Sequence, residues 1–200
     1  MLGLAIDTSY LHASIAVMKN DKILCFKSNK KINQQTTTLN LMIKHSLECL
    51  GLSFDELEYV AISIGPGRFT GLRIGISVAN ALYFALKIPL FSVSNFDAIA
   101  FKYQKQKQNL GIVLETGANK YYFQEYKNRS SLSEVKVINY NKLCELKNQM
   151  YLVGNIDQVD SKCVINAIHI AKFANRKLKN TKNLIFSYIK PQYMTTNYIG

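Results

Sequence analysis

The stretch S-I-G-P-G-R-F-T-G-L-R-I-G, residues 63–75, constrains this chain more than any other segment. An apolar run, Tyr59 to Ile64, precedes it and predicts a buried strand, while Leu72 to Leu86 follows with the length and composition of a helix. A strand, a glycine-rich turn and a helix N-terminus together can present backbone N–H groups to an anion. The spacing matches neither the Walker loop nor the G-x-G-x-x-G dinucleotide motif. The segment therefore suggests a phosphate site without establishing one.

Strand and helix patterns alternate through the first hundred residues. Three short apolar segments at the start predict an antiparallel meander, and the later order is helix, strand, helix, strand, helix. The expected strands are 2–7, 13–18, 23–26, 59–64 and 90–93, and the expected helices are 38–50, 72–86 and 94–102. A meander followed by alternating segments predicts a mixed sheet covered by crossover helices.

A polar segment, Y-Q-K-Q-K-Q-N at residues 103–109, predicts a boundary between two lobes. We expect an α/β lobe over 1–103, a linker over 104–110, and a second, smaller lobe with the tail over 111–200. In the second lobe the expected elements are a hairpin (111–115 and 121–127), strands at 136–138 and 151–153, and a helix over 167–178.

Charge and cysteine content restrict the class of protein. The net charge is +12, and 16 of the 25 basic residues lie in the second hundred. Because 21 of the 25 are lysines scattered without an aromatic stacking motif, specific RNA binding by this chain alone is the less favoured interpretation. Four cysteines without metal or paired spacing, no basic leader and no apolar run of about 18 residues predict a cytoplasmic protein without a membrane span.

Several motifs together resemble those of the TsaB (YeaZ) family, within the actin/hexokinase/Hsp70 ATPase superfamily. They are I-D-T-S at 6–9, A-I-S-I at 61–64, G-P-G-R-F-T-G-L-R-I-G at 65–75, K-I-P-L-F-S-V-S-N-F-D-A-I-A at 87–100 and G-I-V-L-E-T-G-A-N-K-Y-Y at 111–122. The similarity covers residues 1–127 well and the remainder poorly.

The resemblance implies an actin-like (ribonuclease H-like) α/β lobe with a mixed five-stranded sheet, plus a smaller and divergent second lobe. It also implies a non-catalytic subunit without a cofactor, which pairs with a larger TsaD-type paralogue and a TsaE-type ATPase. Such a complex places a threonylcarbamoyl group on the adenosine beside the anticodon of tRNAs that read codons beginning with A. TsaB and TsaD are expected to join through their first two helices, and the free chain could form a homodimer.

No catalytic or metal-binding set is evident in the sequence. His12 and His169 are isolated, and His45 has only Cys49 one helical turn away, which does not make a metal site. An autonomous ATPase or small-molecule kinase, using Asp7 and the loop 65–71, is the alternative function. A bare interaction module without a role in tRNA chemistry is a third.

Two groups of candidate residues follow. The vestigial phosphate-loop candidates are Asp7, Thr8, Ser9, Gly65, Gly67, Thr70 and Gly71. Their alternative role is structural: a polar turn, turn glycines at positive φ, and Thr70 as the N-cap of the next helix.

The candidate partner interface is Arg68, Arg73, Gly75, Val78, Ala79 and Leu82, with Leu39, Met42, Ile43 and Ser46 from the preceding helix. Two of these, Arg68 and Arg73, are the only arginines in the first hundred residues, and arginine offers a planar fork that lysine lacks. Small residues every four positions let helices approach closely. The alternative is that both helices use these residues internally, against the sheet.

Overall fold

The structure is a computed structural model that describes residues 1–29, 35–106, 108–117, 119–128, 130–180 and 189. It divides into two compact units, one formed by residues 1–95 with 166–192, the other by residues 96–165 with 193–200. Each is described by itself below.

The first unit is built on a mixed five-stranded sheet of order β3-β2-β1-β4-β5. Its strands are β1 (Leu2–Asp7), β2 (Ser14–Lys19), β3 (Lys22–Ser28), β4 (Tyr59–Gly65) and β5 (Leu90–Ser94). The first three pair antiparallel, whereas β4 pairs parallel with both β1 and β5. The predicted meander, mixed sheet and element order of the first hundred residues are therefore confirmed.

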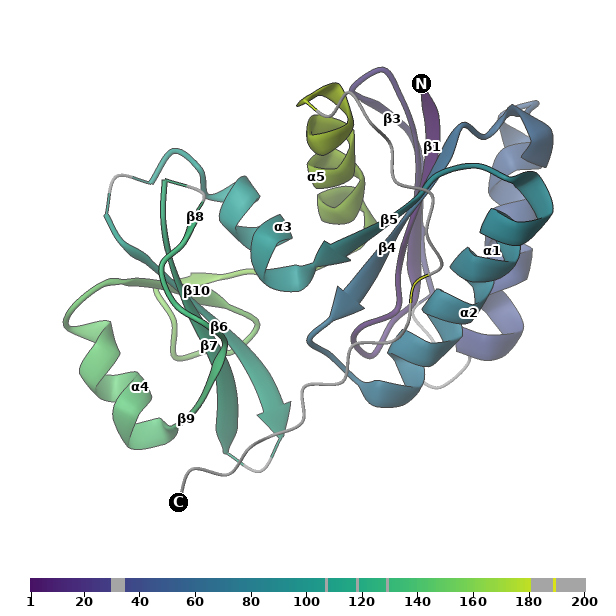
Figure 1. Cartoon of the computed structure of the whole chain (residues 1–200). Helices are drawn as coiled ribbons and strands as arrows, with labels where there is room; N and C mark the ends of the chain where they lie inside the picture. The colour runs from purple at the N-terminus through teal and green to yellow at the C-terminus, as the bar shows by residue number, and fades with distance from the viewer. Residues whose placement is uncertain (30–34, 107, 118, 129, 181–188, 190–200) are drawn as a thin grey trace. The chain divides into compact units, whose positions relative to one another are not determined.

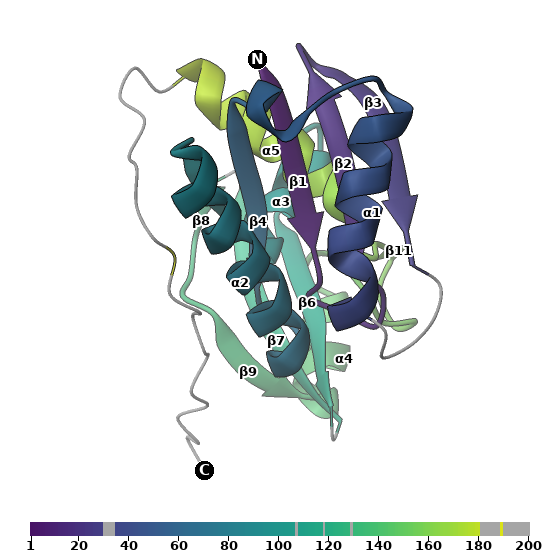
Figure 2. The same cartoon turned by 90° about the vertical axis from the view of Figure 1, so that its right-hand side faces the viewer.

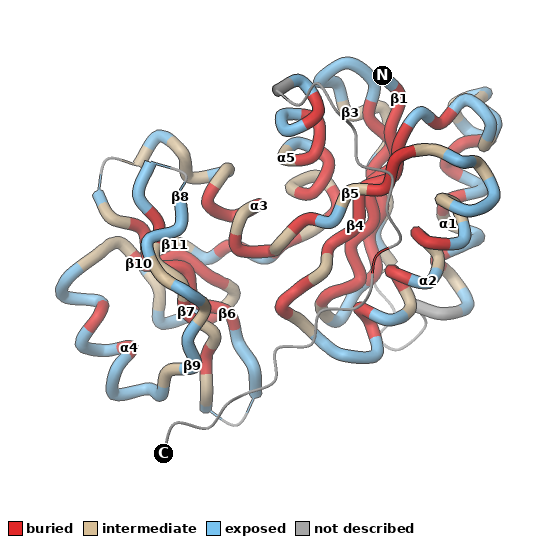
Figure 3. The backbone as a smooth tube through the Cα atoms, viewed as in Figure 1, coloured by how far each residue is buried: buried red, intermediate tan, exposed pale blue. Residues whose placement is uncertain are grey.

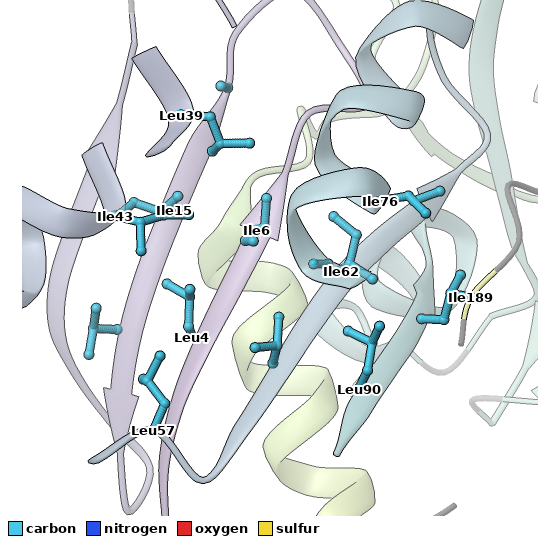
Figure 4. Close-up of a cluster of buried hydrophobic side chains, with 14 of the residues drawn as sticks. Leu4, Ile6, Ile15, Leu39, Ile43, Leu57, Ile62, Ile76, Leu90 and Ile189 are labelled. Carbon is cyan, nitrogen blue, oxygen red and sulfur yellow. The ribbon is translucent and has the colours of Figure 1, made fainter. Parts of the chain in front are cut away.

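Helices cover both faces of this sheet. Helices α1 (Gln35–Cys49) and α2 (Phe69–Leu86) lie side by side on one face, and α5 (Ala167–Asn180) lies on the other (Figures 1 and 2). Strands β1 and β4 are buried almost throughout, as Figure 3 shows, because a central parallel pair is covered from both sides. The main hydrophobic core fills the space between the sheet and α1 and α2 (Figure 4), with labelled members Leu4, Ile6, Ile15, Leu39, Ile43, Leu57, Ile62, Ile76, Leu90 and Ile189.

The second unit is built on a six-stranded sheet in which β11-β10-β6-β7-β8 follow in order and β9 also pairs with β7. The elements are α3 (Asn95–Lys102), β6 (Leu110–Gly117), β7 (Lys120–Lys127), β8 (Ser130–Ser131), β9 (Lys136–Asn139), α4 (Tyr140–Lys147), β10 (Tyr151–Gly154) and β11 (Ser161–Lys162). Leu143 and Leu146 of α4 pack with Val113, Phe123 and Leu152 in a smaller core. The predicted hairpin is present as β6 and β7, and α4 is an element that the sequence analysis missed.

The division into units differs from the predicted boundary at 104–110. Strand β6 already begins inside that segment, at Leu110, and α5 groups with the first unit although it was expected in the second lobe. The physical reason lies in the first sheet: β1 and β2 are apolar on both faces, while α1 and α2 cover only one. Ile170, Ala174 and Leu178 of α5 are buried and supply the missing cover. The predicted tail, 185–200, lies outside the described residues except for Ile189.

Candidate functional site

The Asp-Thr-Ser turn lies directly after β1, at the edge where the parallel strands β1, β4 and β5 all end. Asp7, Thr8 and Ser9 are buried. One Asp7 oxygen, Oδ1, accepts hydrogen bonds from the Ser9 backbone N–H at 3.0 Å and from Ser9 Oγ at 2.6 Å. Burial raises the pKa of the Asp7 carboxyl, although the hydrogen bonds from Ser9 act in the opposite direction. Asp7 and Ser9 thus satisfy each other within the turn, whereas the buried Thr8 Oγ1 has no hydrogen-bond partner.

The glycine-rich turn after β4 lies in contact with this first turn. Gly65 has φ +98°, which favours glycine, and it is followed by a cis peptide bond to Pro66. A Cβ added to Gly67 would lie 2.2 Å from the Ser9 carbonyl oxygen, so the two backbones touch there. Beside that contact, the Arg68 N–H donates to the same Ser9 carbonyl at 2.6 Å. The two turns are therefore closed against each other.

Asn95, which the sequence analysis missed, holds both turns. Its side chain is fully buried, and its Nδ2 donates to Ser9 Oγ at 3.0 Å and to the Pro66 carbonyl at 2.9 Å. Its Oδ1 accepts from Ser63 Oγ at 2.8 Å. A signal for Asn95 was present: a polar residue directly after β5 lies at the strand ends where β1 and β4 also end.

Part of the predicted phosphate-loop surface is taken up by contact between the two turns. An anion site at a helix N-terminus needs free backbone N–H groups and glycines that leave room. Here the N–H groups of Ser9 and Arg68 already donate within the protein, and Gly67 is in contact with Ser9. Thr8 points toward α2, since a Cβ on Gly75 would lie 2.2 Å from Thr8 Oγ1.

Two details of the predicted turn need correction. Helix α2 begins at Phe69 with Arg68 as its N-cap residue, so Thr70 lies inside the helix and does not cap it. Of the three glycines expected at positive φ, only Gly65 has a positive φ. Gly67 instead allows the close contact with Ser9, and Gly71 is a buried residue of α2.

The stripe of small residues on α2 faces the sheet. Gly75 and Ala79 are buried, and a Cβ on Gly75 would also come within 3.0 Å of Ile62 Cδ1 of β4. On α1, Leu39, Ile43 and Ser46 are likewise buried within the first unit. These five residues are used internally, which was the structural alternative for them. The other members of the predicted interface are half-buried (Met42, Val78 and Leu82) or exposed (Arg68 and Arg73).

The exposed side of α2 carries almost no charge. Its exposed residues, called the α2 outer face below, are Phe69, Thr70, Arg73, Ser77, Ala81, Phe84 and Ala85. Phe69 and Phe84 are 50% and 63% exposed, and the Arg73 guanidinium lies 4.1 Å over the Phe69 ring. On the neighbouring α1, Leu41 is 66% exposed. Sequence reasoning missed all three apolar side chains, because it followed the stripe of small residues instead.

By length and composition α2 could also cross a membrane, with a mean hydropathy of 1.3 over its 18 residues. It is the only such helix in the described part of the chain, and it is not an unbroken apolar run, since Arg73, Ser77 and Asn80 interrupt it. A single helix of this kind is weak evidence for a membrane span, since a helix packed on a sheet passes the same test.

The histidines and cysteines form no metal site among the residues described. No group of three or more His, Cys, Asp or Glu side chains there could hold a metal ion. His45 Nε2 lies 3.7 Å from Cys49 Sγ on the exposed side of α1.

Comparison with known proteins places this architecture in a family. The family model of TsaD, described as tRNA N6-adenosine threonylcarbamoyltransferase, matches residues 31–197. A "tRNA threonylcarbamoyladenosine biosynthesis protein TsaB" from Buchnera aphidicola subsp. Schizaphis graminum is 33% identical over 195 residues, which cover 91% of this chain and 90% of the relative. The TsaB of Buchnera aphidicola subsp. Acyrthosiphon pisum is 36% identical over 207 residues, 92% of each chain. The chain belongs to the TsaB family.

The fold agrees with this membership. The solved structure of YeaZ from Pseudomonas aeruginosa superimposes with a TM-score of 0.79, at 19% identity, over 96% of this chain and 99% of that one. The predicted TsaB resemblance and the actin-like α/β fold class are thus confirmed. In this member of the TsaB family, the two turns predicted as vestigial phosphate loops are in contact with each other.

Proposed function

We propose that this chain is the non-catalytic TsaB-type subunit that binds and activates a TsaD-type paralogue in the threonylcarbamoylation of tRNA. The observation that carries the proposal is the α2 outer face, an exposed helical surface with two phenylalanines and one charged residue. Exposed aromatic side chains with an arginine are the composition of protein interfaces rather than of free surface. Both named relatives are tRNA threonylcarbamoyladenosine biosynthesis proteins, which supports the pathway.

The closed turns support the non-catalytic part of the proposal. Catalysis of phosphoryl transfer depends on positioned groups around the phosphates, whereas in these turns the N–H groups of Ser9 and Arg68 donate within the protein. No observation favours the alternative of an autonomous ATPase or small-molecule kinase. Purified chain should therefore hydrolyse no ATP, and turnover that is lost in Asp7→Ala would favour the enzyme instead.

The TsaB resemblance implies docking of TsaD on α1 and α2, which lie side by side (Figure 2). Two further helices from TsaD would complete a four-helix bundle over them, with Phe69, Arg73 and Phe84 at the contact. The half-buried side chains of Met42, Val78 and Leu82 lie between the core and this surface, where they would contribute their exposed edges. Gly75 and Ala79 lie on the buried side of α2, where their small size lets the helix pack close to the sheet.

The same surface has consequences for the other partners. A free chain would cover its apolar face by forming a homodimer, so TsaD would have to displace a second copy of the chain. The TsaE-type ATPase and tRNA would then meet the paired complex, not this chain alone.

The experiment is co-purification with the TsaD-type paralogue of the same organism. Phe84→Glu should weaken pairing by roughly 30-fold, since losing a buried aromatic anchor at an interface costs about 2 kcal/mol. Leu132→Glu is the matched control, because Leu132 is 53% exposed but lies in the second unit. Equal loss in both variants, or in neither, would contradict docking on α2.

The arginines give a second readout of the same surface. Arg73→Ala should reduce pairing and the yield of modified tRNA, and Arg73→Lys should restore only part, because a lysine loses the planar fork and stacks less well on Phe69. Arg68→Ala tests the neighbouring position at the start of α2. Unchanged assembly in the double alanine variant would remove both residues from the interface.

A further inference from the structure

Helix α5 has a one-sided charge distribution. Its buried side packs on the face of the first sheet opposite α1 and α2, as seen in Figures 1 and 3. Among residues 167–179, whose burial the structure describes, the four exposed ones are all basic, and together they are called the basic α5 surface: Lys172, Arg176, Lys177 and Lys179. The described segment 166–180 contains no acidic residue. By contrast, the α2 outer face has one charged residue in seven exposed positions.

Internal contacts account for only half of this charge. Lys179 forms a salt bridge with Asp21 of the β2–β3 turn, and Lys177 lies 5.0 Å over the Phe173 ring. Both are in the last turn, where positive charge is favourable to the helix dipole. Lys172 lies earlier, and it forms no hydrogen bond or ion pair with any described residue.

Arg176 is the second residue without such a bond. It lowers the pKa of Asp21 through their electrostatic attraction, but forms no hydrogen bond or ion pair with a described residue. Lys172 and Arg176 stand four positions apart, where two like charges repel. The fold therefore holds these two positive charges near each other without a hydrogen bond or ion pair to a described residue.

We propose that the basic α5 surface binds the sugar–phosphate backbone of RNA. Lys and Arg side chains bind phosphate through charge and counterion release, without reading sequence. The surface contains no exposed aromatic residue for base stacking, so it would position an RNA but not select one. Identifying that RNA as the tRNA substrate rests on the function proposed above.

The location of α5 is compatible with that function. A protein partner docked on the α2 outer face lies across the sheet from α5, so both surfaces can be occupied at once. The Asn175 side chain of α5 donates to Asp21, which holds the β2–β3 turn against the helix. Lys19 and Lys22 flank that turn and extend the positive charge.

The test compares two variants with the same loss of charge. Lys172→Gln with Arg176→Gln alters the basic α5 surface, whereas Lys136→Gln with Lys147→Gln removes two exposed lysines from the second unit. Binding of labelled tRNA is measured by fluorescence anisotropy at salt concentrations from about 50 to about 300 mM. The measurement is made for the chain alone and for its complex with TsaD. Circular dichroism and pairing with TsaD should be unchanged in both variants.

We expect the α5 variant to bind tRNA roughly tenfold more weakly at the lowest salt, with a log–log salt dependence shallower by about 1 to 2. The control should change by less than about twofold. Equal losses in the two variants would mean that net charge alone attracts RNA and would overturn the proposal, as would unchanged binding in the α5 variant.

Two further arms separate this proposal from its competitors. If only binding to phosphatidylglycerol vesicles depends on Lys172 and Arg176, the surface contacts membrane and the RNA proposal fails. If wild-type chain fails to pair with TsaD yet binds tRNA through α5, the proposed function fails and this inference stands.

Discussion

Replacing Gly67 by alanine tests whether the two turns are closed against each other. The φ of Gly67 is not positive, so alanine meets no backbone strain at this position. The added Cβ would lie 2.2 Å from the Ser9 carbonyl oxygen and 2.7 Å from Ser9 Cβ. Both are held by the buried turn, so the methyl group can be accommodated only if the turns separate.

The magnitude follows from what separation breaks. Overpacking a buried contact costs about 1–3 kcal/mol. Moving Ser9 away also breaks the hydrogen bond from the Arg68 N–H, which leaves buried polar groups unsatisfied at a cost of about 1–3 kcal/mol. Gly67→Ala should therefore lower the free energy of unfolding by roughly 2–6 kcal/mol.

Gly51→Ala provides the matched control in the same unit. Gly51 has φ +66° but nothing within 4 Å of an added Cβ, so its cost is the left-handed backbone alone, about 1–2 kcal/mol. Urea unfolding followed by far-UV circular dichroism suits this chain, which has no tryptophan. If Gly67→Ala is no more destabilising than Gly51→Ala, the turns are not in contact and the argument against a phosphate site fails.

Two more substitutions test buried polar groups of the first unit. Because the raised pKa of Asp7 makes the folded state bind its proton more tightly, the free energy of unfolding should fall as pH rises through that folded pKa. In urea titrations across about pH 4 to 7.5, the Asp7→Asn variant should lack this pH-dependent fall and be at least as stable as wild type at pH 7. If wild type instead becomes more stable than the variant as pH rises, the raised pKa of Asp7 is contradicted. Asn80→Leu should cost roughly 2–4 kcal/mol, because Asn80 bonds both backbone groups of Ile189, at 2.9 and 3.1 Å. Asn40→Leu, at an exposed position of α1, is its control in the same unfolding assay, and equal effects would mean that the Asn80 bonds are not formed.

The fold of the first hundred residues was predictable because each element there has a clear period. Strands of continuous apolar residues and a helix with apolar residues on one face leave few alternatives. Helix α4 was missed because only two of its side chains, Leu143 and Leu146, are buried and its sequence is otherwise polar, although Asn139 caps it by accepting from the Lys142 N–H at 2.9 Å. The return of α5 to the first sheet could not be read from local pattern, since it depends on which sheet face lacks cover.

The candidate site was only partly predictable, for a different reason. A stripe such as Gly71, Gly75 and Ala79 shows that something approaches closely, but not whether that neighbour is a sheet or a partner. In the structure the stripe meets the sheet, and the aromatic residues Phe69 and Phe84 are left outside. Their exposure depends on how α2 is rotated about its axis, which tertiary contacts decide.

The contacts that close the turns also fix the start of α2. Arg68 is the N-cap residue of that helix, and its N–H bonds the Ser9 carbonyl, so the turn after β1 determines where the helix begins. Asn95 holds Ser9 and Pro66 together from the other side. We infer that the residues which hold the two turns together also position the α2 outer face. A variant that separates the turns, such as Gly67→Ala, should accordingly weaken pairing with TsaD even at temperatures where the protein stays folded.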